Sequence, residues 1–329
     1  MSDGEEEDEL TYAASGVDIE ASEAATAALV EAVGSVEMGY AGMLDIGDRY
    51  LALATDGVGT KLLVAEAVGD YSTIGIDCIA MNVNDLVAAG IEPVAFVDYL
   101  AVEAPDDAVA EEIGEGLAAG AEEAGVALVG GETAVMPEVI VGLDLAGTCA
   151  GLAPKDAVFD GVAEPGDALV GWPSSGIHSN GLTLAREAAT RSHDYAESFP
   201  DEFDTDEDRT IGEVLLEPTR IYTHLLGPMR DHGVRGAAHV TGGGWTNLER
   251  LGEHRYVVSN PWPNQPVFEF IQSAGNVGDE EMHKTFNMGT GFVAALPPER
   301  AESLAARTDG GVIGRVEEGG GVAIRGLEL

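Results

Sequence analysis

The alternation of hydrophobic and polar positions is clearest between Gly75 and Pro93, where it predicts an amphipathic helix. Asp77 is suited to cap its start, and Gly90 can close its end in a left-handed conformation. At roughly 100° per residue, one face collects apolar side chains. These are Ile79, Val83, Leu86 and Val87, and the opposite face carries Asp77, Met81, Asn84 and Asp85.

The second face of this helix has an unusual composition for a solvated surface. Alanine, methionine and asparagine stand where lysine and glutamate are common, so we expect this face to contact something other than bulk water. Acids with neighbouring amides suit a hard cation, which takes oxygen ligands and keeps part of its water. A solvated face is the simpler alternative, but we favour a magnesium ion that carries a nucleotide.

Two other stretches place an acid beside glycines near the end of an apolar strand. Arg49 to Thr55 alternates as a strand and leads into Asp56-Gly57-Val-Gly59-Thr60-Lys61. Val126 to Val129 is an apolar run that we expect to end at Gly130-Gly131-Glu132. Asp56, Asp85 and Glu132 would then come from three separate element ends, and residues from different elements can converge on one ion.

The loop that begins at Asp56 is a candidate phosphate or metal site. It differs from the G-x-x-x-x-G-K-[ST] phosphate loop, because the spacing is shorter and the hydroxyl of Thr60 precedes the lysine. Its glycines nevertheless expose backbone amides beside an acid and beside Lys61, one of only three lysines in the chain. A solvated lysine is the alternative, and both interpretations stay open at this point.

The remaining pattern alternates strands with helices in both halves of the chain. At 329 residues, two domains are expected. We predict a mixed α/β or α+β fold, with mixed sheets covered by helices, and three segments: an acidic tail at 1–10, an N-terminal domain at 11–153 and a C-terminal domain at 154–329. The predicted strands are 93–100, 143–152, 166–172, 237–241 and 292–296, with 310–315 as an edge strand, and helices are expected at 20–32, at 105–124, after Gly181, and from Glu217 and Thr246.

The second half contains two glycine-rich strand-to-helix connections, each near a histidine. The first presents hydroxyls, an imidazole and backbone amides at a helix start, where an anion is stabilised. The second places three glycines between strand and helix, as an anion cradle would. The residues concerned are Ser175, Gly176, His178, Ser179 and Asn180 in the first, and His239, Thr241, Gly242, Gly243 and Gly244 in the second.

These second-half residues also have ordinary structural interpretations. His178 and His239 can be structural hydrogen-bonding residues as well as reactive groups. Arg220 is either a clamp for a carboxylate or phosphate, or a surface cation. The Met38–Gly42 turn, with Gly39 and Gly42, is either a ligand contact or a plain loop.

The charge of the chain limits the partners that it can bind and indicates the salt concentration in which it is stable. The formal charge is −43, from 59 acids against 16 lysines and arginines. Affinity for polyphosphate needs clustered cations, so we expect neither nucleic acid nor an anionic membrane as a partner. At molar salt the Debye length falls to about 3 Å, which screens the self-repulsion, so we predict a salt-adapted protein. An unchanged fold in millimolar salt without metal would contradict this.

Neither the N-terminal ten residues nor the cysteine usage indicates export or membrane insertion. The first ten residues are an acidic run without an apolar stretch or basic flank, which predicts a disordered tail rather than a signal peptide. No run approaches 18 apolar residues. Cys78 and Cys149 lie in apolar settings and are expected to be small buried hydrophobes, which fits a reducing cytoplasm.

Taken together, these motifs resemble one family, phosphoribosylformylglycinamidine cyclo-ligase, also called aminoimidazole ribonucleotide synthetase. The resemblance covers about residues 12–323. The first-half motifs alone also fit a wider ATP-using superfamily that includes formylglycinamidine ribonucleotide synthase, thiamine monophosphate kinase and selenophosphate synthetase. The matching stretches are 14–19, 55–61, 75–90, 130–137, 174–181, 239–244 and 286–289.

The resemblance implies a homodimer whose N-terminal sheets join into a barrel-like core, with an α/β C-terminal domain on each subunit. It implies ATP bound mainly by the N-terminal half, together with magnesium and potassium. The implied reaction closes the imidazole ring of formylglycinamidine ribonucleotide, with release of ADP and phosphate through an iminophosphate. The chain departs from the family at the glycine-rich loop, where it has only Gly39-Tyr-Ala-Gly42.

Site residues follow from the same resemblance. Asp56, Asp85 and Glu132 would be ligands of magnesium and the phosphate region, and Lys61 would contact phosphates. His178 and His239 would face the reacting centre, and the residues do not say which of them moves a proton. The substrate phosphate would lie on Gly176–Gly181 or on Gly242–Gly244. The wider ATP-binding set is Gly39, Gly42, Gly57, Gly59, Thr60, Asp77, Asn84, Gly130 and Gly131.

Two other functions share part of this pattern. A sister enzyme of the superfamily would keep the acids and phosphorylate a different acceptor, and the second-half motifs favour the cyclo-ligase over it. A nucleotide-sensing module would bind ATP without steady ADP release, and it could lose one of the acids without harm.

Overall fold

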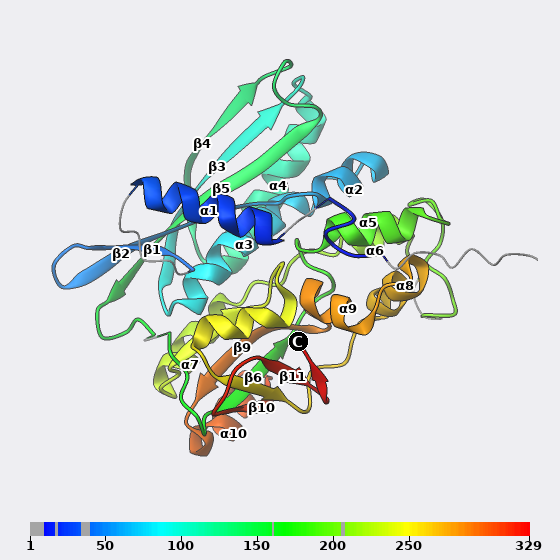
Figure 1. The fold of residues 1–329 in the computed structure, drawn as a ribbon. Coiled ribbons are helices and arrows are strands. Elements are labelled where there is room, and N and C mark those ends of the chain that lie inside the picture. Colours follow the sequence, from blue (N-terminus) through cyan, green and yellow to red (C-terminus); the bar gives the residue numbers. More distant parts are fainter. Residues whose placement is uncertain (1–9, 17–18, 34–39, 160, 205–207) are drawn as a thin grey trace, which may run out of the picture.

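A computed structural model describes residues 10–16, 19–33, 40–159, 161–204 and 208–329. Figure 1 shows two sheets, with the N-terminal one above and the C-terminal one below. The division falls between β5, which ends at Pro154, and β6, which begins at Ala168. No helix in the described part of the chain is long and apolar enough to cross a membrane.

The N-terminal sheet is mixed and has the strand order β1-β2-β5-β3-β4. Only β3 and β4 pair in parallel. Burial alternates in the middle of β2, where Ala52 and Ala54 are buried and Leu53 between them is half exposed. Its strands are β1 (Gly42–Asp45), β2 (Arg49–Gly57), β3 (Glu92–Val102), β4 (Ala127–Val135) and β5 (Leu143–Pro154).

The C-terminal sheet has seven strands in the order β12-β11-β8-β10-β6-β9-β7. It is also mixed, since β11 and β8 pair in parallel and the other neighbours are antiparallel. β9 is buried along its whole length, as a central strand covered on both faces should be. The strands are β6 (Ala168–Pro173), β7 (Gly236–His239), β8 (Arg255–Val258), β9 (Thr290–Leu296), β10 (Gly311–Glu317), β11 (Val322–Ile324) and β12 (Leu327–Glu328).

Helices cover one face of the first sheet and surround the second. α3 contacts β2, β3 and β5, and α4 packs on α3 and β4. Two mixed sheets with helices agree with the predicted mixed α/β class. The helices are α1 (Ile19–Val33), α2 (Lys61–Val68), α3 (Ile74–Ala88), α4 (Asp107–Ala124), α5 (Leu182–Thr190), α6 (Ile211–Leu215), α7 (Leu226–Asp231), α8 (Pro266–Gly275), α9 (Asp279–Thr285) and α10 (Pro298–Arg307), with 3-10 turns η1 (Thr223–Leu225) and η2 (Gly244–Leu251).

Helix α3 confirms the predicted amphipathic pattern and explains its unusual second face. The predicted apolar face is fully buried. On the second face Asp77, Met81 and Asn84 are buried as well, because the helix lies between the N-terminal sheet and the C-terminal half. The prediction that this face avoids bulk water is therefore confirmed, and what it contacts is the second domain of the same chain.

Close helix packing depends on glycine where α3 meets α4. A Cβ at Gly75 would lie 2.1 Å from the backbone nitrogen of Leu117, and one at Gly116 would lie 2.6 Å from the Ser72 carbonyl. No side chain fits at such distances, so these glycines set the separation of the two helices. Gly90, at φ 76°, ends the α3 segment in the predicted left-handed conformation.

Four local predictions were wrong. Asp77 lies inside α3 and does not cap it, since the helix begins at Ile74. β4 does not stop at Gly130 but continues to Val135, because glycine interrupts side-chain packing without ending the ladder. Residues 217–222 form no regular element, and helical structure begins only at Thr223. β10 is an internal strand between β8 and β6 rather than an edge.

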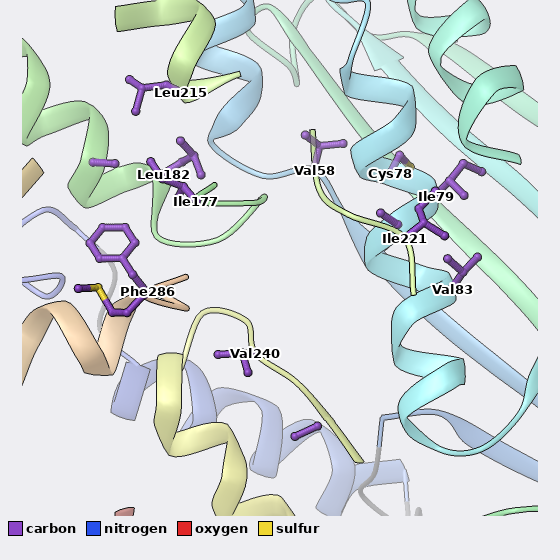
Figure 2. Packing of buried hydrophobic residues seen from close by; sticks show 14 of the residues in the cluster. Val58, Cys78, Ile79, Val83, Ile177, Leu182, Leu215, Ile221, Val240 and Phe286 are labelled. Atoms are coloured by element: carbon purple, nitrogen blue, oxygen red, sulfur yellow. The ribbon is translucent and has the colours of Figure 1, made fainter. Parts of the chain in front are cut away.

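The two halves share a continuous hydrophobic core. Figure 2 shows labelled residues from both halves in one cluster, among them Ile79 and Val83 of α3 and Ile221 and Val240 of the C-terminal half. All four are buried. Burial of a side chain of this size stabilises by about 1.5–3 kcal/mol, so the seam between the halves is a core and not a hydrated cleft.

Both cysteines behave as the predicted small buried hydrophobes. Cys78 and Cys149 are free and fully buried. Burial raises the pKa of the Cys149 thiol to about 12, and burial also raises the pKa of Cys78, where nearby aspartates add to the shift. Neither thiol forms the reactive thiolate near neutral pH.

We therefore expect both thiols to be inert in the folded protein. In concentrated KCl at pH 8, a chromogenic disulfide reagent should label neither cysteine within minutes, and both should react at once in denaturant. Fast labelling of one thiol in the folded state would contradict its burial.

Candidate active site

The candidate site lies where the C-terminal part of α3 meets β7 and the irregular segment 217–222. α3 brings Asn84 and Asp85 to this seam, and β7 ends at His239. The end of β2 adds Asp56, whose backbone carbonyl accepts from Asn82 Nδ2 at 3.2 Å. Residues from both halves of the chain therefore form one polar centre beside the shared core.

Asp56 and Asp85 form the acidic part of this centre. Burial raises the pKa of Asp56, and the negative charge of Asp85 raises it further, whereas a 2.7 Å hydrogen bond from the Gly57 N–H opposes the shift. The side chain of Asp85 is 20% exposed. Two carboxylates that repel one another at a partly open position are suited to share a cation.

His239 is held by the residues around it in one tautomer. Asn84 Oδ1 accepts from the Tyr222 N–H at 2.9 Å, so its Nδ2 is the donor toward His239 Nε2 at 3.4 Å. The imidazole proton is then on Nδ1, which donates to Asp85 Oδ1 at 3.1 Å. His239 is fully buried, so this network positions the Asp85 carboxylate from inside the domain seam.

His178 is also buried and neutral. The Ser175 N–H donates to its Nε2 at 3.2 Å, which leaves the proton on Nδ1, and Nδ1 has no hydrogen-bond partner. Its backbone φ of 66° is unusual for a residue other than glycine. Burial lowers its pKa well below 6.5, and the positive charges of Lys61 and Arg220 act in the same direction.

The burial of His178 predicts in which direction the stability of the fold changes with pH. Above pH 6.5 neither folded nor unfolded His178 binds a proton, but below it the unfolded chain binds one that the folded protein excludes. Stability is therefore lost as pH falls below 6.5, by up to about 1.4 kcal/mol per pH unit from this residue. His178→Asn should reduce the difference in urea midpoint between pH 7.5 and 5.5. An unaltered pH dependence in His178→Asn would contradict the assignment.

The ammonium group of Lys61 forms a buried ion pair. Its side chain is fully buried, with Nζ 2.7 Å from Asp77 Oδ2 and 2.6 Å from the Glu217 carbonyl oxygen. Asp77 Oδ1 in turn accepts from the backbone N–H and hydroxyl of Thr219, at 2.8 and 2.6 Å. Lys61 and Asp77 thus form a buried ion pair that ties α2 and α3 to the C-terminal half, and the phosphate contact of Lys61 stays a prediction.

The two glycine-rich connections of the second half lie next to one another. A Cβ at Gly242 would contact Asn180 Oδ1 at 3.4 Å, and Asn180 Nδ2 is 3.5 Å from the Met81 sulfur on α3. Thr241 donates from its N–H to Asn247 Oδ1, and Ser175 donates to the Pro218 carbonyl. The hydroxyl of Ser179 is buried without a partner. The structure thus brings the candidate substrate residues Ser175–Asn180 and Thr241–Gly244 together.

Glu132 does not join Asp56 and Asp85. Because β4 continues past the glycines, Glu132 pairs with Tyr99, which points to the open face of the sheet. Asp56 points to the opposite face, in one row with Gly147, Asp98 and Gly131. No group of three His, Cys, Asp or Glu side chains suited to a metal occurs in the described part of the chain. The expected three-acid convergence within one chain is therefore wrong.

The other predicted nucleotide residues have mixed placements. Gly39 lies outside the described residues. Gly42 and Gly57 are in β1 and β2, and Gly59 adopts φ 69° ahead of Thr60, whose hydroxyl is 3.0 Å from that of Thr183. Gly130 and Gly131 lie within the exposed strand β4, and Arg220 is exposed beside a pocket described below.

Sequence reasoning missed two residues of the site. Tyr222 is fully buried, its ring centroid lies 6.4 Å from those of both His178 and His239, and its N–H fixes the Asn84 amide. Asp98 shares the row of Asp56, and burial raises its pKa. A signal for Asp98 was present, since a lone aspartate on the buried side of an apolar strand breaks the alternation.

The carboxylates present fit a magnesium ion that also binds phosphate. Magnesium is commonly held by one or two carboxylates plus substrate phosphates and water, rather than by a full protein cage. Asp56 and Asp85 supply two such carboxylates, and the electrostatic cost of their proximity is what a divalent cation removes.

Comparison with known proteins defines the class first. Residues 38–153 match the model of the AIR synthase related protein N-terminal domain, and residues 164–326 match that of the C-terminal domain. AaThiL, solved in complex with AMPPCP and TMP, superposes with a TM-score of 0.69 at 18% identity, over 95% of this chain and 96% of that chain. The chain thus has the two domains of the AIR synthase related proteins, and its fold is shared with AaThiL.

Relatives with higher sequence identity identify one family among the AIR synthase related proteins. The phosphoribosylformylglycinamidine cyclo-ligase of Methanococcoides burtonii is 47% identical and covers 98% of this chain and 99% of its own. That of Methanosarcina acetivorans is 46% identical over 95% of this chain and 97% of its own. The chain belongs to the phosphoribosylformylglycinamidine cyclo-ligase family, a family of enzymes.

Proposed function

We propose that the chain closes the imidazole ring of formylglycinamidine ribonucleotide, using ATP and releasing ADP, phosphate and 5-aminoimidazole ribonucleotide. The observation that carries this proposal is the 47% identity to a cyclo-ligase over 98% of this chain. The Asp56–Asp85–His239 centre at the domain seam supports it. A reaction of de novo purine synthesis draws on soluble nucleotide pools, so we place the enzyme in the cytoplasm.

The chemistry needs activation of an amide oxygen, which is a poor leaving group. Transfer of the γ-phosphoryl group to this oxygen gives an iminophosphate, and attack by the amidine nitrogen then expels phosphate and closes the ring. Phosphoryl transfer demands positioning and charge stabilisation from the protein rather than covalent participation.

In this proposal Asp56 and Asp85 hold magnesium, which would neutralise charge on the triphosphate and on the transferring group. His239 orients Asp85 through the 3.1 Å Nδ1–H hydrogen bond, and Asn84 fixes the tautomer of His239. His239 is thus a positioning residue. Potassium is proposed as a second, monovalent ion.

The substrate would lie over the adjacent connections 175–180 and 241–244, whose backbone amides stabilise an anion at a helix start. His178 shapes the first connection through its hydrogen bond with the Ser175 N–H. Arg220 is kept as a candidate for contact with an anionic group of the substrate.

We further propose a homodimer formed through the open face of the N-terminal sheet. Leu44, Leu53, Val97 and Tyr99 point to this face and are 61%, 50%, 40% and 43% exposed. An apolar sheet face of this extent, with β4 as its uncovered edge, is expected to be covered in solution. Glu132 points to the same face and would lie at or near the interface.

The test is turnover of purified protein in concentrated KCl with magnesium, ATP and formylglycinamidine ribonucleotide, following both ADP and the aminoimidazole product. Equal amounts of the two products are expected. ADP release without imidazole would favour a sister enzyme, and ATP binding without ADP release would favour a sensing module. Light scattering of the same sample should give a dimer mass, and a monomer would contradict the proposed interface.

A further inference from the structure

A pocket of about 340 Å³ in the C-terminal half is lined in part by Pro228 of α7 and Arg307 of α10. Figure 1 labels both helices. We call this pocket the Arg220 pocket. Its position is separate from Asp56, Asp85 and the two glycine-rich connections, none of which line it. It is lined by Trp172, Pro173, Arg220, Tyr222, His224, Pro228, Arg307, Thr308 and Asp309.

The pocket concentrates positive charge in a chain that has little. Two of the 16 lysines and arginines, Arg220 and Arg307, line it in a protein of formal charge −43. Arg307 is 51% exposed and forms an exposed ion pair with Asp231 at 2.8 Å. Within the described part of the chain, the side chain of Arg220 has no hydrogen-bond or ion-pair partner. Among this many acids, an unpaired guanidinium at a pocket is an available anion-binding group.

The floor of the pocket is rigid. Trp172 is 2% exposed, and its indole N–H donates to the Thr308 hydroxyl at 3.0 Å. Tyr222 is fully buried, and its hydroxyl donates to the Pro173 carbonyl at 2.9 Å. Both aromatic residues are thus held by the walls they line, and Arg220 extends from a backbone that Asn84 fixes through a 2.9 Å hydrogen bond. Such support is what a binding site needs to be preorganised.

Asp309 adds a carboxylate to the two guanidinium groups of the lining. It follows α10 at φ 52°, and its side chain is exposed. A carboxylate repels a bare anion but accepts hydrogen bonds from hydroxyl groups. Two guanidinium groups and one carboxylate therefore match a ligand that carries a phosphate and vicinal hydroxyls.

We propose that the Arg220 pocket binds a sugar phosphomonoester, with Arg220 and Arg307 on the phosphate and Asp309 on the sugar hydroxyls. The volume is at the lower end of known ligand pockets, which suits a pentose phosphate rather than a whole dinucleotide. The ligand is either the phosphoribosyl part of the substrate or a separate sugar phosphate. Tyr222 connects the pocket to the reacting centre, since it is one of the lining residues and its ring centroid lies 6.4 Å from those of both His178 and His239.

The test measures binding without turnover, so it does not depend on the ring-closing reaction. Ribose 5-phosphate is titrated calorimetrically into the whole protein in concentrated KCl with EDTA and no ATP. We expect saturable binding, weakened at least about tenfold by Arg220→Gln, as loss of a hydrogen bond to a charged group implies. Arg315→Gln, at an exposed arginine outside the pocket, should leave affinity within twofold. Absence of binding, or equal affinity in the Arg220 and Arg315 variants, would overturn the proposal.

Two further experiments, one with a variant of Asp309 and one by competition, identify the ligand. Asp309→Asn keeps a side chain that tolerates positive φ, and it should weaken ribose 5-phosphate while leaving inorganic phosphate unaffected; equal effects on both would overturn the role of Asp309. In turnover assays, competition of ribose 5-phosphate with the ribonucleotide substrate would assign the pocket to the substrate itself. Binding without such competition would assign it to a separate sugar phosphate.

Discussion

Asp85→Asn is expected to lower kcat by about 100- to 1,000-fold, the cost of removing one preorganised electrostatic group from a reacting centre. The asparagine is isosteric, so packing at the domain seam is kept. What is lost is one of the two carboxylates that would hold magnesium and the charged acceptor of the His239 Nδ1–H. Steady-state ADP release at saturating magnesium measures the loss.

The control for this prediction is Glu111→Gln, an equally conservative change at an exposed position on α4, which should retain wild-type kcat. His239→Gln should reduce kcat less than Asp85→Asn, since His239 acts through Asp85. It should also shift the magnesium concentration needed for half-maximal rate, which a purely structural role would leave in place. Activity of Asp85→Asn within threefold of wild type would remove Asp85 from the proposed centre.

The sequence identified the helix of the site but not its contacts. The periodicity of α3 predicted its buried face, and the scarcity of lysine and glutamate on the other face predicted contact with something drier than water. Which part of the protein contacts this face is decided by tertiary structure. Asn84 bonds to residues 220, 222 and 239, more than 130 positions away along the chain, and no local pattern encodes such pairings.

The misplaced residues share one physical cause, which is that a motif read along the chain does not say which way a side chain points. Gly130-Gly131 was interpreted as a strand end, yet the ladder with β3 continues through it and strand alternation turns Glu132 to the open face. Lys61 follows a glycine-rich loop as a phosphate lysine would. It is the first residue of a helix packed against the second domain, and its charge is used inside the protein.

Lys61→Met is expected to cost about 3–5 kcal/mol of unfolding free energy, because it leaves the Asp77 carboxylate buried without a counter-charge. Both side chains are fully buried at 2.7 Å separation. Burial lowers the pKa of Lys61, and Asp77 opposes this shift. The pair is thus stable only while both members are present, and urea unfolding in concentrated KCl should show the loss in its midpoint.

Two matched variants separate charge from packing. Lys284→Met removes an exposed ion pair with Glu280 and should cost no more than about 0.5 kcal/mol. Lys61→Met with Asp77→Asn removes both charges, while the asparagine Oδ1 can still accept from Thr219, so the double variant should recover more than half of the loss. If Lys61→Met were as stable as Lys284→Met but inactive, Lys61 would serve the phosphates after all, and the buried pair would not be what joins the two halves.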